Sequence, residues 1–443
     1  MVVGSRQEID VILDMIIETL PKYRSFSLNN FEKIEQVSKL TKDEKFAIQV
    51  VGNVLPFKVN PYVLDNLIDW DNRENDSIYH LTFPQKEMLT EEHFDKMASA
   101  LIKDVGRNEI KRIANEIRME LNPHPAGQAS ANVPSVGDSK LDGVQHKYRE
   151  TLLFFPSNGQ TCHAYCTFCF RWPQFVGLND LKFASRETEL MVEYLKSHPE
   201  ITDVLFTGGD PMIMGAKHLE KYVLPILDVP SIKTIRFGTK VLGYWPHRFL
   251  TDPDADDVLR LFEKVVESGR TLAFMAHFNH LAELLPEAQK MAVKRVLATG
   301  AQIRTQSPLL RHINDDSQTW TDMWKEQVIQ GMIPYYMFLT RDTGAQHYFA
   351  VPLVESHEIF KGAYEHVSGI CRTVRGPSMS AGPGKVQVLG PVEVRGEKAL
   401  ALRFIQGRDP SWVHRPFFAK YDPKAVWLDE LKPAFGESKF FFE

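Results

Sequence analysis

Three of the four cysteines in this 443-residue chain lie close together, in the segment Cys162-His-Ala-Tyr-Cys166-Thr-Phe-Cys169. Four cysteines in a chain of this length do not form a disulfide framework. Three thiols at these spacings converge only if the backbone loops around one centre. They suit a 4Fe–4S cube with one open iron, which can chelate a small molecule. A zinc site completed by His163 or Cys371, or chance clustering, are the alternatives.

A second candidate follows the next predicted strand, where the chain contains Gly208, Gly209 and Asp210. Glycines let a backbone approach a ligand closely, and Asp210 can accept hydrogen bonds from an ammonium group. Polar residues also follow the later predicted strands, namely Thr239, Lys240, His277, Asn279, His280, Gln306, Ser307, Arg341 and Asp342. Each signal is weak alone, because Gly-Gly-Asp is usually a turn. Their convergence at the carboxyl ends of strands indicates one site, as in β/α barrels.

The third candidate is a lysine between glycines, in Ser380-Ala-Gly-Pro-Gly384-Lys385-Val. Small neighbours let a bulky planar ligand reach the amine, and lysine amines form Schiff bases with aldehydes such as pyridoxal phosphate (PLP). The same pattern is also typical of an exposed turn. The pattern alone therefore makes Lys385 only a candidate for binding PLP.

Short apolar runs that alternate with amphipathic segments must position these residues. The predicted strands are 152–155, 203–207, 234–237, 272–276, 302–305 and 334–339, and the helices between them are 187–197, 217–227, 255–268, 286–299 and 318–331. After a longer first interval the units repeat roughly every 30–37 residues, which is typical of βαβ units and a parallel sheet. Six units fit a partial (β/α)6 TIM-type barrel better than an open doubly wound sheet, so we predict that α/β fold.

Three regions follow from this pattern: a mostly helical region over residues 1–145, the barrel over 146–350, and an extension over 351–443 that holds the candidate PLP lysine. Hydrophobic residues make up 43% and charged residues 25% of the chain, with a net charge of −5, which is typical of a soluble protein. Because no segment is dominated by Lys and Arg, we expect no nucleic-acid partner. The apolar runs are too short to span a bilayer, so we expect a cytoplasmic protein with no membrane partner. The composition leaves a homo-oligomer open.

The cysteine segment, with Phe168 before its last cysteine, resembles the cluster motif of the radical S-adenosylmethionine (SAM) superfamily. In that superfamily the open iron binds SAM, which is cleaved to a 5′-deoxyadenosyl radical with an electron from the reduced cluster. The resemblance implies a one-electron reductant of the flavodoxin or ferredoxin type. The Gly208-Gly209-Asp210 segment resembles the element that holds the amino group of SAM. We also expect the strand-end residues to contact SAM, namely Thr239, His277, Asn279 and Gln306.

Longer stretches between His146 and Val388 are similar to the lysine 2,3-aminomutase family, which uses both SAM and PLP. Matching segments include His277-Phe-Asn-His280, Pro334-Tyr-Tyr336 and the glycine-flanked lysine. The resemblance implies that Lys385 binds PLP, and we assign Tyr148 to PLP as well. It also implies that Arg171, two residues past the third cysteine, binds the carboxylate of an amino-acid substrate.

The chain departs from that family where its lysine enzymes carry acids that hold the distal ammonium of the substrate. Here Arg341 and Asp342 follow the Pro-Tyr-Tyr strand, and Ser378 stands seven residues before Lys385. We assign all three to the substrate. We therefore expect an amino acid 2,3-aminomutase that moves an amino group from Cα to Cβ and does not use free lysine. The alternatives are an enzyme of the same family with a protein-bound or other substrate, and a non-catalytic Fe–S or zinc structural protein.

Overall fold

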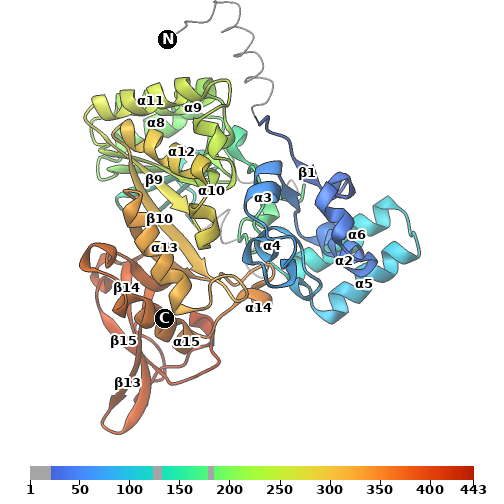
Figure 1. Cartoon of the computed structure of the whole chain (residues 1–443). Helices are drawn as coiled ribbons and strands as arrows, with labels where there is room; N and C mark the ends of the chain where they lie inside the picture. The colour runs from blue at the N-terminus through green and yellow to red at the C-terminus, as the bar shows by residue number, and fades with distance from the viewer. Residues whose placement is uncertain (1–20, 123–131, 178–183) are drawn as a thin grey trace, which may run out of the picture.

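The computed structural model describes residues 21–122, 132–177 and 184–443, and one large mixed sheet dominates it (Figure 1). Among these residues, eleven strands pair in the order β15-β14-β13-β12-β11-β10-β9-β8-β7-β6-β5, and the edge strand β5 (Val144–Tyr148) is antiparallel to β6. Six of them are parallel and adjacent in chain order, namely β6 (Thr151–Phe154), β7 (Asp203–Phe206), β8 (Thr234–Thr239), β9 (Thr271–His277), β10 (Gln302–Leu309) and β11 (Ile333–Leu339). The winding keeps one direction along this run, as in a barrel and unlike a doubly wound sheet. The predicted partial (β/α)6 barrel is confirmed.

Amphipathic helices connect these strands, and each crossover returns the chain in the same direction. They are α8 (Thr188–Ser197), α9 (Ala216–Leu227), α11 (Ala255–Glu267), α12 (Glu287–Ala298) and α13 (Ser317–Ile329). In α11, for example, Val258, Leu261, Phe262 and Val265 are buried, while its charged residues lie on the other face. Because every strand runs the same way, the carboxyl ends of all six strands lie along one edge of the sheet.

A row of phenylalanines keeps four of these strands at one level. Phe154, Phe206, Phe237 and Phe274 are paired in register on β6, β7, β8 and β9, and all four side chains are fully buried. Their neighbouring ring centroids lie between 5.3 and 5.9 Å apart, and the row packs against Phe262 of α11. A one-residue slip of any strand would turn its ring away from the helices. Since each buried ring contributes about 1.5–3 kcal/mol, the row stabilises one register and aligns the strand ends.

The sheet continues past residue 350 without a break. β12 (Arg375–Ser380) lies parallel beside β11, and β13 (Gly384–Val394), β14 (Glu397–Gly407) and β15 (Pro416–Lys420) follow as antiparallel strands. Figure 1 shows β13 to β15 in red at the end of the molecule away from α11 and α9. Residues 351–443 thus share their sheet with the barrel, and the three-region division stays a prediction.

The N-terminal region is a group of helices beside the barrel, drawn in blue and cyan in Figure 1. Its elements are β1 (Phe26–Ser27), α2 (Lys42–Val54), β2 (Lys58–Val59), α3 (Pro61–Asn66), α4 (Ser77–Thr82), α5 (Glu91–Ile102) and α6 (Arg107–Glu120). Side-chain caps begin several of these helices: Thr41 and Glu44 form a capping box at α2, and Asn60 caps α3. Within the described ranges, no helix is long and apolar enough to cross a membrane.

Candidate active site

The cysteine loop leaves the carboxyl end of β6, and its three thiols lie there partly buried and unbridged. Burial raises the pKa of all three, that of Cys166 to about 12, and charge on the neighbouring thiols adds to the rise at Cys162 and Cys166. Crowded, buried thiolates repel one another, so the three ionise together only around a positive centre. The residues present therefore fit an iron–sulfur cluster, which supplies that charge and takes thiolate ligands.

The structure offers the zinc alternative little support. His163 is buried with its ring edge-on to Tyr23 at 5.2 Å, and burial lowers the pKa of His163 to about 3. Cys371 lies elsewhere, in a short helical turn beside Ser368. Among residues 21–122, 132–177 and 184–443, no three His, Cys, Asp or Glu side chains converge as ligands of a single ion. A cube differs from a single ion because each of its irons takes one thiolate, so the three ligands stand apart.

The N-terminal region holds the cysteine loop through the main chain of the loop. Tyr165 N donates to the carbonyl of Lys58 at 2.8 Å, and Lys58 Nζ donates to the carbonyl of Cys162 at 2.7 Å. The buried amide of Asn60 donates to the carbonyls of His163 at 3.2 Å and Tyr244 at 3.0 Å. β2 and the cap of α3 thus fix the first half of the loop.

Helix α4 fixes the second half. Thr167 N donates to the carbonyl of Leu81 at 2.9 Å, and Thr167 Oγ1 donates to the carbonyl of His80 at 2.8 Å. Sequence reasoning gave residues 1–145 no part in the site. Contacts to backbone carbonyls require no particular residue type on the accepting side, so they leave no motif to find.

The Gly208-Gly209 turn packs against the segment just before the first cysteine. Gly208 has φ +133°, and a Cβ added there would lie 2.2 Å from the side chain of Gln160. A Cβ on Gly209 would lie 2.5 Å from the backbone of Thr161, and Asp210 N donates to Thr161 O at 2.8 Å. In the structure the two glycines make room for the segment before the first cysteine, and their contact with SAM stays a prediction.

The carboxylate of Asp210 is fully buried among protein donors. It accepts hydrogen bonds from Thr239 Oγ1 at 2.6 Å, Lys240 N at 2.9 Å and Met212 N at 2.9 Å. Burial raises the pKa of Asp210, and these donors oppose the rise. In the structure Asp210 and Thr239 join the ends of β7 and β8. Their contacts with SAM stay a prediction.

A buried polar network lies beside the ends of β8 and β9. Lys240 Nζ donates to Glu283 Oε1 at 2.6 Å and to Asn279 Oδ1 at 2.8 Å, while Asn279 Nδ2 donates to Ser307 Oγ at 2.8 Å. Asn279 N donates to Glu283 Oε2 at 2.8 Å. Glu283 and Asn279 have no exposed surface, so breaking this paired network would leave a buried charge alone. Sequence reasoning missed Glu283, because its sequence neighbours do not distinguish it from a surface acid.

His277 and Gln306 are opposite one another on β9 and β10, and their Nε2 atoms lie 2.8 Å apart. Burial, with the charge of Lys240, lowers the pKa of His277 to about 3. The imidazole is therefore neutral and accepts the Gln306 amide through Nε2. Unlike Thr239 and Asn279, these two side chains keep partial exposure at the strand ends.

Lys385 lies near the start of β13, and its amine is over the ring of Tyr336 at 4.2 Å from the centroid. Burial lowers the pKa of Lys385 to about 7, and the charges of Arg375, Arg236 and Lys147 contribute. A neutral amine is the nucleophilic form that Schiff-base chemistry needs, and the binding of PLP at Lys385 stays a prediction.

Two further cations, Arg375 and Lys147, lie near Lys385. The guanidinium of Arg375 lies over the rings of Tyr335 and Tyr336, at 4.2 and 4.5 Å from their centroids. Lys147 Nζ donates to the carbonyl of Ala381 at 3.0 Å, and burial lowers the pKa of Lys147 to about 8. Neither cation forms an ion pair with a carboxylate among the residues that the structure describes. This charge fits a phosphorylated ligand such as PLP.

Two more predicted residues, Arg171 and Arg341, form a second cationic group close to Tyr148. The guanidinium groups of Arg171 and Arg341 both lie over the ring of Phe170, at 5.0 and 5.3 Å. Burial lowers the pKa of Arg171 to about 10, and the charge of Arg341 contributes. Burial raises the pKa of Tyr148 to about 12, while Arg341 opposes the rise. Tyr148, Arg171 and Arg341 are therefore close enough to influence one another.

Asp342 and Ser378 are less available to a ligand. Asp342 Oδ1 lies 3.7 Å from Arg341 Nε, so its charge is directed at that arginine. Ser378 is fully buried, and its hydroxyl donates to the carbonyl of Met337 at 3.3 Å. In the structure that hydroxyl ties β12 to β11, and its contact with a substrate stays a prediction.

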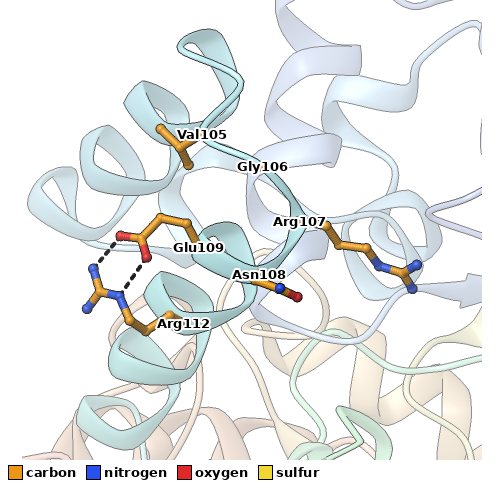
Figure 2. Close-up of a pocket in the computed structure, with 6 residues that line it drawn as sticks. All are labelled: Val105, Gly106, Arg107, Asn108, Glu109 and Arg112. Carbon is orange, nitrogen blue, oxygen red and sulfur yellow. Dashed lines mark hydrogen bonds and ion pairs between the residues drawn. The ribbon is translucent and has the colours of Figure 1, made fainter.

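One hollow of the molecule is unrelated to these residues. It lies at the turn between α5 and α6 and is lined by Val105, Gly106, Arg107, Asn108, Glu109 and Arg112 (Figure 2). Glu109 is already paired with Arg112 on the same helix, at 2.8 Å between Arg112 Nε and Glu109 Oε2. No residue that sequence reasoning singled out lines it, so we do not assign it to the site.

A partial parallel barrel that carries a three-cysteine loop after its first strand defines a radical SAM enzyme. A protein of Aquifex aeolicus named "Putative L-lysine 2,3-aminomutase" is 31% identical to this chain over 404 residues, which cover 91% of this chain and 95% of that protein. The L-lysine 2,3-aminomutase of Acetoanaerobium sticklandii is 26% identical over 82% of this chain and 76% of its own length. The L-lysine 2,3-aminomutase of Clostridium subterminale is 24% identical over the same shares. The chain belongs to the lysine 2,3-aminomutase family.

This membership makes the protein a radical SAM enzyme of the isomerase class, and it implies a 4Fe–4S cluster, SAM, a small-molecule substrate and an external reductant. No family model matches the chain. Among solved structures, Streptococcus suis SuiB covers 71% of this chain and 66% of its own, with 11% identity and a TM-score of 0.35. That likeness is too low to add to the assignment.

Proposed function

We propose that this protein is a SAM- and PLP-dependent amino acid 2,3-aminomutase whose substrate ends in a carboxylate or a neutral polar group. One observation carries the substrate class: Arg171 and Arg341 face the same ring, and the position seven residues before Lys385 is a buried serine. The family's lysine enzymes carry acids at the positions of Arg341 and Ser378. An ammonium buried beside these two guanidinium groups, with no carboxylate of its own, would cost several kcal/mol.

Each cofactor would supply a different part of the chemistry. When bound, the cluster with SAM supplies a carbon radical that abstracts hydrogen, and PLP supplies an aldehyde and a conjugated ring. Cys162, Cys166 and Cys169 would hold the cluster, and Lys385 would hold the PLP aldehyde. Arg375 and Lys147, both close to Lys385, are suited to the PLP phosphate because each carries a charge that no described carboxylate neutralises.

The chain's own residues would position the substrate between these groups. Arg171 is suited to a bidentate contact with the α-carboxylate, because its guanidinium is held over the rings of Phe155 and Phe170, at 4.4 and 5.0 Å from their centroids. Arg341 would hold the far end of the substrate. The network of Lys240, Asn279 and Glu283 would keep the strand ends in place.

Product analysis tests this proposal. The anaerobic protein, reconstituted with iron, sulfide and PLP and then reduced, is incubated with SAM and a mixture of amino acids, and the products are identified by mass spectrometry. We expect the β-isomer of an acidic or neutral polar amino acid, accompanied by 5′-deoxyadenosine. The Cys169→Ala variant is the matched control and should release neither. Release of 5′-deoxyadenosine without conversion of any free amino acid would favour a protein-bound substrate.

A further inference from the structure

A second hollow opens beside the cysteine loop, between that loop and the N-terminal region. It is lined by Ser25, Ser27, Leu28, Asn29, Gly52, Pro56, Phe57, Lys58, Arg118, Tyr165, Phe175, Val176 and Gly177. Tyr165 belongs to the loop itself, directly before Cys166, and Lys58 Nζ donates to the carbonyl of Cys162 at 2.7 Å. One side chain therefore separates the hollow from the backbone of two cluster ligands.

The charge of this lining is entirely positive. Lys58 and Arg118 are its only ionisable cations, and no acid lines it among the described residues. Arg118 donates to neutral acceptors, the carbonyls of Val54 at 2.7 Å and Asn53 at 2.8 Å and the amide of Asn115 at 2.9 Å. Hydrogen bonds to neutral groups leave its positive charge in place. The hollow therefore attracts an anionic partner.

Its shape and composition suit a protein rather than a single ion. The rings of Tyr165 and Phe175 stack at 4.6 Å, and Phe57 and Leu28 add apolar surface. Ser25 and Asn29 are exposed at the rim. An aromatic centre with a polar rim is the usual anatomy of a protein interface.

We propose that this hollow is the docking site for an acidic one-electron carrier protein that reduces the cluster. The inference rests on the proposed function, because it needs a redox centre at the three cysteines. In the step itself, one electron passes from the reduced carrier to the oxidised cluster, and no atom or proton is transferred. The stacked ring of Tyr165 and the Lys58 side chain give this face a short path to the cluster, and electron transfer weakens steeply with distance.

Charge changes at Asn29 test the proposal, because this rim residue is exposed and is not part of the machinery. Asn29→Glu should slow reduction of the cluster by chemically reduced flavodoxin roughly threefold to tenfold at low ionic strength, and Asn29→Lys should accelerate it. Asn29→Gln should match the wild type. Asn108→Glu is the matched control, since Asn108 is an exposed asparagine of the other hollow (Figure 2). The rates are measured anaerobically by stopped-flow absorbance of the cluster, and salt should shrink the differences.

Photoreduced 5-deazariboflavin, a small neutral reductant, separates docking from cluster chemistry. All four variants should accept electrons from it at the wild-type rate. The proposal is overturned if Asn29→Glu and Asn29→Lys take electrons from flavodoxin alike, if Asn108→Glu is slowed equally, or if flavodoxin does not reduce the wild type. It is also overturned if inorganic phosphate blocks reduction at constant ionic strength, which would indicate a small-anion site. Failure of the deazariboflavin-reduced wild type to cleave SAM would instead contradict the proposed function.

Discussion

The cysteine side and the lysine side of this sheet hold their reactive groups by different means. The cysteine loop is fixed by directed hydrogen bonds to its own backbone, from Lys58, Asn60 and helix α4. Lys385 instead lies against the stacked rings of Tyr336 and Phe338, among cations that repel it. The hydrogen bonds fix the position of the cysteine loop, and the crowded cations set the charge of the Lys385 amine.

The difference follows from what each side would hold. A metal cluster needs its ligands at set points, and backbone anchors provide that whatever side chains the loop carries. A Schiff-base lysine needs a neutral amine, and crowded positive charge provides that by lowering its pKa. The same crowding destabilises the ligand-free fold, so an anion that binds there stabilises the protein by mass action.

The largest expected effect is loss of the cluster from the cysteine side. Cys162→Ala, Cys166→Ala and Cys169→Ala should each abolish a reconstituted content of about four irons per chain. Cys371→Ala is the matched control, because Cys371 is buried beside Ser368, away from the loop, and should keep the full content. Iron and sulfide analysis with electron paramagnetic resonance measures this. Equal loss from Cys371→Ala would contradict a three-ligand cluster.

On the lysine side, the largest effect should come from Arg341→Ala. Removing one charged hydrogen-bond partner costs about 1.5–3 kcal/mol, so kcat/KM for the true substrate should fall roughly ten- to hundredfold. Arg260→Ala, an exposed arginine on α11 paired with Asp257, serves as the control and should have little effect. Efficient conversion of L-lysine to β-lysine by the wild type would contradict the substrate class.

A smaller effect is expected from pH. The folded pKa of Lys385 is about 7, so the reactive neutral amine is the minor form at pH 6 and the major form at pH 8. The rate of PLP capture should therefore rise about tenfold over this interval and then level off, whereas an ordinary lysine with a pKa near 10.4 would keep rising. Stopped-flow absorbance gives the rate, and borohydride trapping with peptide mapping gives the residue. A trapped adduct on Lys147 would contradict the assignment.

Sequence reasoning predicted the barrel and the cysteine loop because both have local signatures. The periods of the apolar residues predict the strands and helices, and the three cysteines lie within one short segment of the chain. The sequence also predicted a close approach at Gly208 and Gly209, but it could not show that a protein segment packs there. The packing partner, the segment at Gln160 and Thr161, lies at least 47 residues earlier in the sequence, so only the fold brings the two segments together.

Other parts of the site had no local signal. Arg375 lies on β12, beside the strand that carries Lys385, whereas Lys147 lies on β5, at the far edge of the sheet. The sequence around Glu283 is typical of a surface acid, but in the structure Glu283 is buried and paired with Lys240 from the neighbouring strand end. Such residues are defined by burial and by long-range charge, which depend on how the fold arranges the strands rather than on residue type.

The smallest expected effect tests the anchoring of the cysteine side. In Asn60→Asp the side chain still caps α3, because its Oδ1 continues to accept from Val63 N, but it no longer donates to the carbonyls of His163 and Tyr244. Losing these buried hydrogen bonds should lower the free energy of unfolding by about 1–3 kcal/mol, measured by chemical denaturation. Asn66→Asp is the matched control, since Asn66 is exposed on the same helix and should change stability by less than about 0.5 kcal/mol.

The sign of the pH dependence distinguishes anchoring from general damage. Burial would raise the pKa of the new carboxylate in the folded state above its unfolded value of about 3.9, since Asn60 has no exposed surface. The folded state then binds more protons than the unfolded state, so the stability deficit should grow as pH rises above about 4 and shrink below it. Because the lost donors hold the loop that carries the three cysteines, the reconstituted variant should also release iron to a chelator a few times faster than Asn66→Asp. Iron release at the control rate, with stability lowered, would mean that Asn60 supports the fold without holding the loop.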